Sequence, residues 1–327
     1  MHSLTNMLKY KRKPRTESIK KFCQNFLHPT FGFPDKHGNY ELVIGDKPRI
    51  CFAAHYDSVH SEDGMQNVQI SNQVATLEKN SKSNCLGADC ATGVWLILEM
   101  IDAGIEGVYV VHAEEESGCI GSRDLVESNP PWLAHIDAVI SFDRKGKESV
   151  ITHQMGMRTA SDAFAVSLDN ILGLGMRPDD TGSYTDSNEY ADIVSECTNL
   201  SVGYMAQHTK NESQDLQFAV DLRAKLIEAD WSKLVIERDP SVIEYSYSGG
   251  YRYTYGSHWT NVDYDDPMGQ FRSSVDITPY EELVRENPEA VARLLSDYFQ
   301  SHLELYEELY DYGMQDKPSS ALNRWPW

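Results

Sequence analysis

The stretch VYVVHAEEESGCIGS, residues 108–122, places three consecutive glutamates directly behind an apolar run. The apolar part predicts a buried strand, and Ser117-Gly118 predicts a turn immediately after it. Side chains alternate between the two faces of a strand, so Glu114, Glu115 and Glu116 cannot all serve one site within a strand. Two neighbouring glutamates can do so where the strand ends and the backbone turns.

Further apolar runs alternate with helical patterns along the chain. Strands are expected at 40–45, 49–57, 107–113, 135–143 and 198–204, and helices at 1–28, 92–104, 122–128, 161–175 and 213–237. Strands that alternate with helices predict an α/β layered domain built on a central sheet.

The character of the chain changes after Asp239. Residues 245–259 are aromatic and glycine-rich, and helix-capping signals follow at 278–281 and 287–288. We therefore expect a catalytic domain over residues 1–239 and a C-terminal appendage over 240–327, in which the tyrosines pack the appendage onto the domain.

The balance of charge limits the kinds of partner. The chain has 29 basic and 50 acidic side chains and a formal net charge of −21. Nucleic acid is not expected as a partner, because a phosphate-binding face needs clustered Lys and Arg. The basic cluster KYKRKPR, residues 9–15, is interpreted as a solvated helix face or frayed terminus.

The sequence also indicates a compartment. No apolar run reaches the length of a membrane span, and the first residues lack the apolar core of a signal peptide. The six cysteines follow no zinc-knuckle or secreted-framework spacing. A cytoplasmic protein with reduced thiols, not bound to a membrane, is expected.

Metal-capable side chains lie at the ends of the strand-like runs. They are His55 and Asp57, the glutamates 114–116, Asp143 and His208, and Asp89 adds a carboxylate at the start of a helix. Each has an ordinary explanation alone: Asp89 suits a helix N-terminus, and Asp143 could pair with Arg144. All of these explanations would have to hold at once, so the set favours a functional site at the strand ends.

The series resembles the co-catalytic zinc peptidases that include bacterial leucyl aminopeptidase and the tripeptidases. The matching pieces are His55-Tyr56-Asp57, Leu86-Gly87-Ala88-Asp89, Glu115-Glu116-Ser117-Gly118, Ser141-Phe142-Asp143 and Gln207-His208-Thr209 with Asn211-Glu212. They follow the order of that family over roughly residues 15–237. The resemblance implies a three-layer α/β fold with a mostly parallel, mixed central sheet and helices on both faces.

The resemblance also implies a role for each residue. Two zinc ions would be bridged by Asp89, one also held by His55 and Asp143 and the other by Glu116 and His208. Asp57 would hold His55, and Glu115 would be the general base. No chemistry is assigned to Glu114.

General metal chemistry agrees with these roles. Histidine nitrogens and carboxylate oxygens are the ligands of hydrolytic zinc, and Co²⁺ or Mn²⁺ can replace zinc on them. Such a pair of ions acidifies a water and polarises a carbonyl, and an unligated carboxylate then accepts the proton.

The branch of the family follows from the spacing. Only 64 residues separate Asp143 from His208, which leaves no room for the dimerisation domain that tripeptidase and deacylase relatives insert there. Thr185-Asp186-Ser187 departs from the family's Ser-Asp-His-like tripeptide, so the role of Asp186 stays open. The family commonly has a cis peptide after the bridging aspartate, which predicts one at Asp89–Cys90.

We therefore predict an aminopeptidase that acts on peptides with free N-termini, with an oligomer left open. An N-acyl amino-acid deacylase or carboxypeptidase is the alternative, favoured if Arg144 points into the pocket, since those substrates present a carboxylate. A catalytically inactive binding module is disfavoured because every ligand and the base are present. A role of His153 in the pocket stays open, and His112 is expected to be a hydrogen-bonded core residue.

Overall fold

The computed structural model describes residues 2–246, 252–255 and 288 of the 327. The chain divides into two units, Met1–His258 and Trp259–Trp327. The helices expected after Thr278 and Asn287 lie outside the described residues, apart from Pro288. The expected domain boundary at residue 239 stays a prediction.

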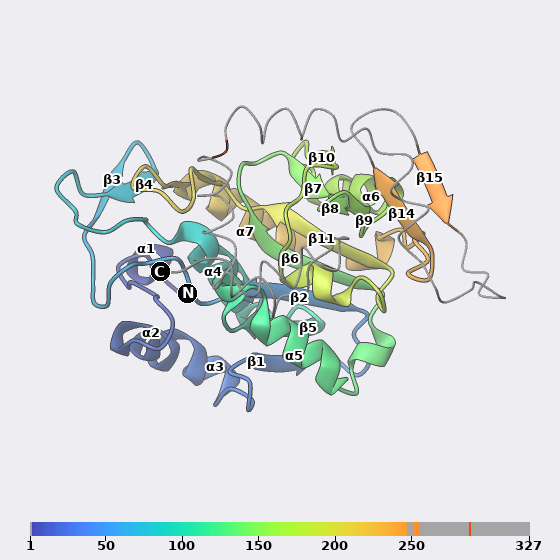
Figure 1. Cartoon of the computed structure of the whole chain (residues 1–327), viewed down its shortest axis with the longest axis horizontal. Coiled ribbons are helices and arrows are strands. Elements are labelled where there is room, and N and C mark those ends of the chain that lie inside the picture. Colours follow the sequence, from blue (N-terminus) through green and yellow to red (C-terminus); the bar gives the residue numbers. More distant parts are fainter. Residues whose placement is uncertain (1, 247–251, 256–287, 289–327) are drawn as a thin grey trace, which may run out of the picture. The chain divides into compact units, whose positions relative to one another are not determined.

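A seven-stranded sheet runs through the first unit (Figure 1). Its order is β1-β5-β2-β6-β11-β7-β10. The strands are β1 Tyr40–Ile44, β2 Ile50–His55, β5 Gly107–His112, β6 Ala138–Arg144, β7 Ser149–Ile151, β10 Arg177–Asp179 and β11 Glu196–Ser201. The central strands β5, β2, β6 and β11 are parallel, whereas β1 pairs antiparallel with β5 and β7 antiparallel with β11. The predicted mixed, mostly parallel sheet is confirmed.

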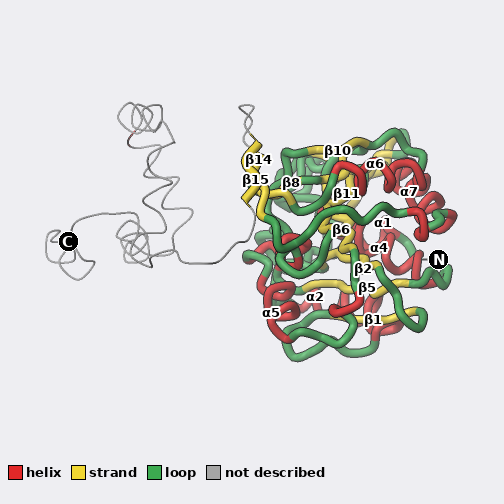
Figure 2. The backbone as a smooth tube through the Cα atoms, turned by 90° about the vertical axis from the view of Figure 1, so that its right-hand side faces the viewer, coloured by secondary structure: helices red, strands yellow, loops and turns green. Residues whose placement is uncertain are grey.

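Helices cover both faces of this sheet. The helices are α1 Leu4–Met7, α2 Glu17–Phe22, α3 His28–Phe31, α4 Ala88–Asp102, α5 Ile120–Ser128, α6 Asp162–Leu172 and α7 Leu216–Glu228. Figure 2 looks along the layers, with α5 on one side of the stacked strands and α4, α6 and α7 on the other.

Buried side chains form two hydrophobic clusters, one on each face of the sheet, and the side chains of β2 point alternately into one and the other. Phe52 and Ala54 pack with α4 in one buried cluster, whereas Cys51 and Ala53 join Leu125 of α5 in the other. All six residues of the strand are buried, as expected for a parallel strand covered by helices on both faces.

Two small sheets flank the main one. The first pairs β12 Tyr204–Met205, β13 Ser213–Asp215, β4 Val74–Leu77 and β3 Val68–Ser71. The second pairs β15 Arg252–Tyr255, β14 Ile243–Ser246, β9 Met157–Arg158 and β8 His153–Gln154. Single turns of helix complete the described elements at Cys23–Leu27, Glu115–Ser117, Leu133–His135, Asp186–Tyr190 and Trp231–Lys233.

Two expected helices are wrong in extent. The helix over 1–28 is broken into short pieces, because residues 8–16 run as a loop that includes an antiparallel bridge between Tyr10 and Met65. The helix over 213–237 begins only at Leu216, since the Asp215 side chain caps it and residues 213–215 pair with β4. It ends at Glu228, and the chain continues without helix apart from the turn at Trp231.

The basic cluster at 9–15 is also different from the prediction. Lys11 and Arg12 are buried rather than solvated. The cause is the loop itself, in which the Lys11 N–H donates to the carbonyl of Gly64 and the Arg12 carbonyl accepts from Ser58. The cluster is therefore fixed to the chain that follows β2.

No helix within residues 2–246 or at the other described positions is long and apolar enough to span a membrane.

Candidate metal centre

Three neighbouring parallel strands carry most of the predicted site residues to one edge of the sheet. His55 ends β2, the turn Glu115–Ser117 follows β5, and Asp143 lies near the end of β6. Strand β2 pairs with both β5 and β6, so these three strand ends lie side by side. The carboxyl edge of an open α/β sheet is where such folds place their sites.

The structure brings the five predicted ligands into two groups that share Asp89. In the first, the Nε2 atom of His55 lies 3.1 Å from Oδ1 of Asp89 and 3.4 Å from Oδ1 of Asp143. In the second, the Nε2 atom of His208 lies 3.2 Å from Oδ2 of Asp89 and 3.1 Å from Oε2 of Glu116. Each carboxylate oxygen of Asp89 therefore faces one of the two histidines.

The donor set fits hydrolytic metal ions. It consists of imidazole nitrogens and carboxylate oxygens, which suit zinc, cobalt and manganese. Oε1 of Glu116 is buried and has no hydrogen-bond partner among the residues that the structure describes. A buried carboxylate oxygen without a partner is costly, and a cation would satisfy it.

A second combination of possible ligands includes a thiol. Atoms of His55, Cys90 and Asp143 lie within 4.8 Å of one another, as do those of His55, Asp89 and Glu116. Burial raises the pKa of Cys90 well above its usual range, and its thiol donates to the carbonyl of Phe142 at 3.1 Å. Cys90 is therefore a poorer ligand than Asp89.

Negative charge is concentrated in this buried cluster. Burial raises the pKa of Glu115 well above its usual range, and burial together with Asp89 raises that of Asp143. Hydrogen bonds to Asp89 and Glu116 raise the pKa of His208 to about 11. Carboxylates that resist ionisation beside a histidine that retains its proton indicate a site that requires positive charge.

Asp57 holds three parts of the cluster at once. Its Oδ1 accepts from the N–H of Glu115 and its Oδ2 from the N–H of Glu116, both at 3.1 Å. Oδ1 also lies 3.4 Å from Nδ1 of His55, longer than a strong hydrogen bond. The contact with His55 was predicted, whereas the contacts with the glutamate backbone were not.

The three glutamates diverge as the turn requires. Glu114 has a φ of 52° and its carboxylate pairs with Arg15 at 3.3 Å. Glu116 faces His208, while Oε2 of Glu115 lies 3.8 Å from Nε2 of His55. Glu115 thus lies beside the two ligand groups, and Glu114 points to a different partner.

Several residues around Asp143 were not predicted. Thr185 donates to its Oδ2 at 3.0 Å and the Tyr204 hydroxyl to its Oδ1 at 3.1 Å. Asp186, whose role was open, is buried and accepts a 2.6 Å hydrogen bond from Ser122. Burial raises the pKa of Asp186 to about 8. The Thr-Asp-Ser tripeptide was the sequence signal for Thr185 and Asp186, whereas no motif marked Tyr204.

Glu212 supports the loop that carries Asp89. Its Oε2 accepts from the N–H groups of Leu86 and Gly87 at 2.8 Å, and its Oε1 from the N–H of Asp89 at 3.1 Å. Burial raises the pKa of Glu212 to about 7. The peptide bond between Asp89 and Cys90 is cis, as predicted.

The remaining candidates have other partners. Arg144 lies 3.4 Å from Asp179 and donates to Thr181 at 2.9 Å. His153 is buried and shares a hydrogen bond with Thr152. His112 is a buried core histidine that contacts the Tyr190 hydroxyl at 3.2 Å, which confirms its prediction.

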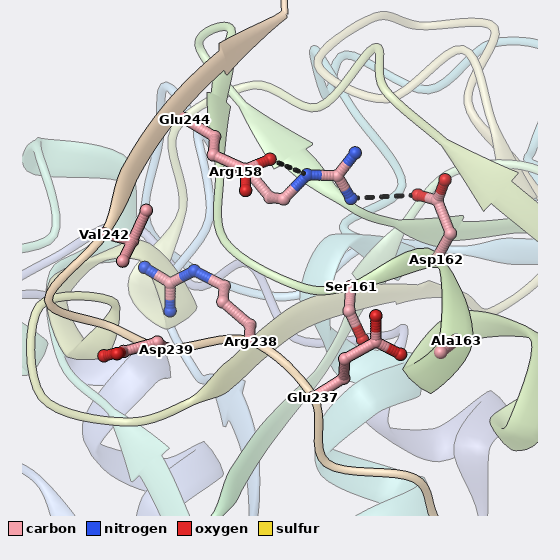
Figure 3. Close-up of a pocket in the computed structure, with 9 residues that line it drawn as sticks. All are labelled: Arg158, Ser161, Asp162, Ala163, Glu237, Arg238, Asp239, Val242 and Glu244. Atoms are coloured by element: carbon pink, nitrogen blue, oxygen red, sulfur yellow. Dashed lines mark hydrogen bonds and ion pairs between the residues drawn. The ribbon is translucent and has the colours of Figure 1, made fainter. Parts of the chain in front are cut away.

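A cavity lies apart from these residues, between the start of α6 and the chain leading to β14 (Figure 3). None of the predicted site residues lines it. Its Arg158 pairs with Asp162 at 2.9 Å and with Glu244 at 3.1 Å. Arg238 donates to the carbonyls of residues 191, 194 and 195. The cavity residues thus connect β14 to the domain.

Solved structures share this architecture. A tripeptidase from Staphylococcus aureus matches with a TM-score of 0.56 and 12% identity, covering 69% of this chain and 95% of its own. The aminopeptidase PepT from Bacillus cereus ATCC 10987 gives 0.53 and 14%, with the same coverage. The TET1 peptidase of Pyrococcus horikoshii gives 0.50 and 16%, covering 69% and 98%. At these identities the likeness shows the fold, which is that of the co-catalytic zinc peptidases.

A family model matches part of the sequence. Residues 40–175 match the model described as peptidase family M28. That segment contains His55, Asp89, the glutamates and Asp143, and it ends before His208. The comparison with curated proteins gave no match. The predicted recognition and three-layer fold are confirmed, and the protein is a zinc-dependent peptidase.

Proposed function

We propose that the protein is a di-zinc aminopeptidase that releases residues from peptides with a free N-terminus. The observation that carries the proposal is the position of Asp89, whose two oxygens face His55 and His208 at 3.1 and 3.2 Å. A second carboxylate, Asp143 or Glu116, stands beside each histidine. This arrangement suits two cations that share one bridging carboxylate.

Each ion would have three protein ligands, with Asp89 common to both. His55, Asp89 and Asp143 would hold one zinc ion, and Asp89, Glu116 and His208 the other. Bound there, the two ions would acidify a water and polarise the scissile carbonyl. Asp57 fixes His55 and the two glutamates relative to one another, because its carboxylate contacts all three residues.

Glu115 is the residue suited to move the proton. It lies next to His55 but outside the two ligand groups, so its carboxylate can accept a proton from the attacking water. The same carboxyl group then delivers that proton to the nitrogen of the leaving amine. Burial raises its pKa, which suits a group that must hold a proton between two steps.

The charge of the site favours an aminopeptidase over a deacylase or carboxypeptidase. The cluster is strongly acidic, and the free α-amine of a peptide is the complementary group. Deacylase and carboxypeptidase substrates present a carboxylate instead, which an arginine would bind. Arg144 was the candidate for that role, and its guanidinium is held by Asp179 and Thr181.

Digestion of a peptide library tests the proposal. The zinc-loaded protein should remove single residues from free N-termini and leave N-acetylated copies of the same peptides intact. Glu115→Gln, loaded identically, is the matched control. Cleavage of N-acyl amino acids or of C-terminal residues would support the alternative activities, and no cleavage of any amide would indicate an inactive binding module.

Assembly and compartment belong to the same proposal. The Pyrococcus horikoshii peptidase can assemble into a tetrahedron or a large octahedral shell. By that likeness we propose that copies of this chain associate, which light scattering of the purified protein would test. A cytoplasmic location stays a prediction.

A further inference from the structure

Arg12 is the unexpected component of this region. It belongs to the basic cluster at 9–15 and precedes the segment that matches the peptidase family. Its side chain is 0% exposed. Burial lowers the pKa of the Arg12 guanidinium. A charge buried to this degree is costly unless specific partners satisfy it, so its contacts indicate what it does.

The partners of Arg12 are the backbones of the segments that carry two ligands. Its Nε donates to the carbonyl of Tyr56, the residue after His55, at 2.9 Å. Its Nη2 donates to the carbonyl of Gly87 at 2.6 Å and to that of Asp89 at 3.2 Å. One planar guanidinium thus joins the end of β2 to the start of α4.

The start of α4, where two of these carbonyls lie, is not helical. Asp89 has a ψ of 107° and Cys90 a ψ of 41°, so the first turn departs from helical geometry there. Glu212 accepts from the N–H groups of the same turn, while Arg12 donates to its carbonyls. The Glu212 carboxyl group therefore binds N–H groups of this turn and the Arg12 guanidinium binds its carbonyls, so the backbone around Asp89 is held through both kinds of group.

Gly87 shows how closely Arg12 approaches this turn. It has a φ of 74°, and a Cβ atom there would lie 3.3 Å from the Arg12 guanidinium nitrogens and 2.6 Å from a ring carbon of His60. The turn is thus packed directly against the guanidinium, which leaves the backbone of Asp89 little freedom to shift.

We infer that Arg12 is a positioning residue for the metal centre, holding Asp89 so that each of its carboxylate oxygens faces one histidine. The inference rests on the proposed di-zinc function. Arg12 is not one of the proposed ligands and acts through the backbone of residues 56, 87 and 89. Lysine would keep the positive charge but lacks the planar fork that reaches both segments.

The test is zinc affinity of the full chain, measured by competition with a chromophoric chelator. Arg12→Lys should bind zinc about 10- to 100-fold more weakly than the wild type, the range for residues that orient metal ligands. Excess zinc should restore kcat with KM unchanged, and the absorption bands of the Co²⁺-loaded variant should shift. Arg15→Lys, whose partner is Glu114 on the surface side, is the matched control and should match the wild type in affinity.

The outcomes separate the two proposals. If the wild type binds fewer than two zinc ions or cleaves no peptide, the proposed function fails. If the wild type passes and Arg12→Lys is folded with unchanged affinity and cobalt bands, the Arg12 inference is overturned. If Arg12→Lys and Arg12→Gln both stay unfolded in excess zinc, Arg12 serves folding rather than the metal centre, and the inference is likewise overturned.

Discussion

Neighbouring glutamates of identical chemistry have different surroundings in this protein. Glu114 turns to Arg15, Glu115 lies beside His55, and Glu116 faces His208. The difference arises from the left-handed backbone at Glu114 and the turn that follows it. We therefore expect substitutions that each replace one carboxylate by an amide to have unequal effects.

Glu115→Gln should abolish turnover while the protein keeps its metal. The amide cannot accept the proton of water, so kcat should fall by about 10²- to 10⁴-fold. Steady-state kinetics and metal analysis of the same preparation measure both. Glu114→Gln is the control and should lower kcat less than about twofold, because its partner is a surface arginine. A larger loss in Glu114→Gln than in Glu115→Gln would mean that the assignment is off by one residue.

Glu116→Gln should instead weaken one metal site. An amide oxygen is neutral and a poorer ligand than the carboxylate that faces His208 at 3.1 Å. Zinc titration followed by calorimetry should show one site retained and the other weakened by at least tenfold. Two unaltered sites in this variant would remove Glu116 from the set of ligands.

The sequence indicated side chains that the fold brings together, but it did not indicate the residues that hold them in place. His55, Asp89 and His208 could be read from their order and residue type. Arg12 could not, because its function depends on burial by chain more than 40 residues away, such as Tyr56 and Gly87. A cluster of basic residues in an acidic chain ordinarily lies in water, and nothing local in the sequence marks the exception.

At the scale of elements, loops between parallel strands determine the geometry. The central strands were predictable because each is a continuous apolar run, buried on both faces. The interruption of the N-terminal helix and the late start of α7 were not. Both depend on pairing with distant segments, Met65 in one case and β4 in the other.

Substitution of Asp57 tests how strongly the end of β2 and the turn after β5 are coupled. Its carboxylate connects the end of β2 to the turn after β5 through the N–H groups of Glu115 and Glu116. In Asp57→Asn one oxygen becomes an NH₂ group, which cannot accept, so one of the two backbone hydrogen bonds is lost. We expect metal affinity and kcat to fall together by about 10- to 100-fold. A loss of kcat at full metal occupancy, measured by titrating zinc into the assay, would instead indicate a role in the chemistry itself.

At the scale of the whole molecule, the buried acidic cluster connects metal binding to stability. Asp89, Glu116 and Asp143 gather at the edge of the sheet where β2, β5 and β6 end, without a lysine or arginine among the ligands. Removing zinc with a chelator should lower the melting temperature, since each ion binds only the folded chain. Free zinc at 100 times Kd contributes about 2.7 kcal/mol per site. Calorimetry with and without zinc measures the change in melting temperature. Glu115→Gln should show the same change as the wild type.

Acid should destabilise the protein partly through His60, a histidine outside the metal cluster. Burial, together with the nearby positive charge of Arg12, lowers its pKa to about 3 from an ordinary 6.5. The neutral ring accepts from the N–H of Arg12 and contacts Gln66. Between those two pKa values the unfolded chain binds a proton that the folded chain does not. The free energy of unfolding therefore decreases as pH falls from 6.5 towards 3, by up to about 1.4 kcal/mol per pH unit.

His60→Gln isolates this contribution, because glutamine can accept from Arg12 and donate to Gln66 without titrating. In zinc-free protein, the variant should lose less stability than the wild type when urea unfolding is compared at pH 7 and pH 5. His135→Gln, at an exposed position, is the matched control and should follow the wild type. If the free energy of unfolding falls equally for His60→Gln and the wild type between pH 7 and pH 5, His60 is protonated in the folded protein. The Arg12 N–H would then have lost its acceptor.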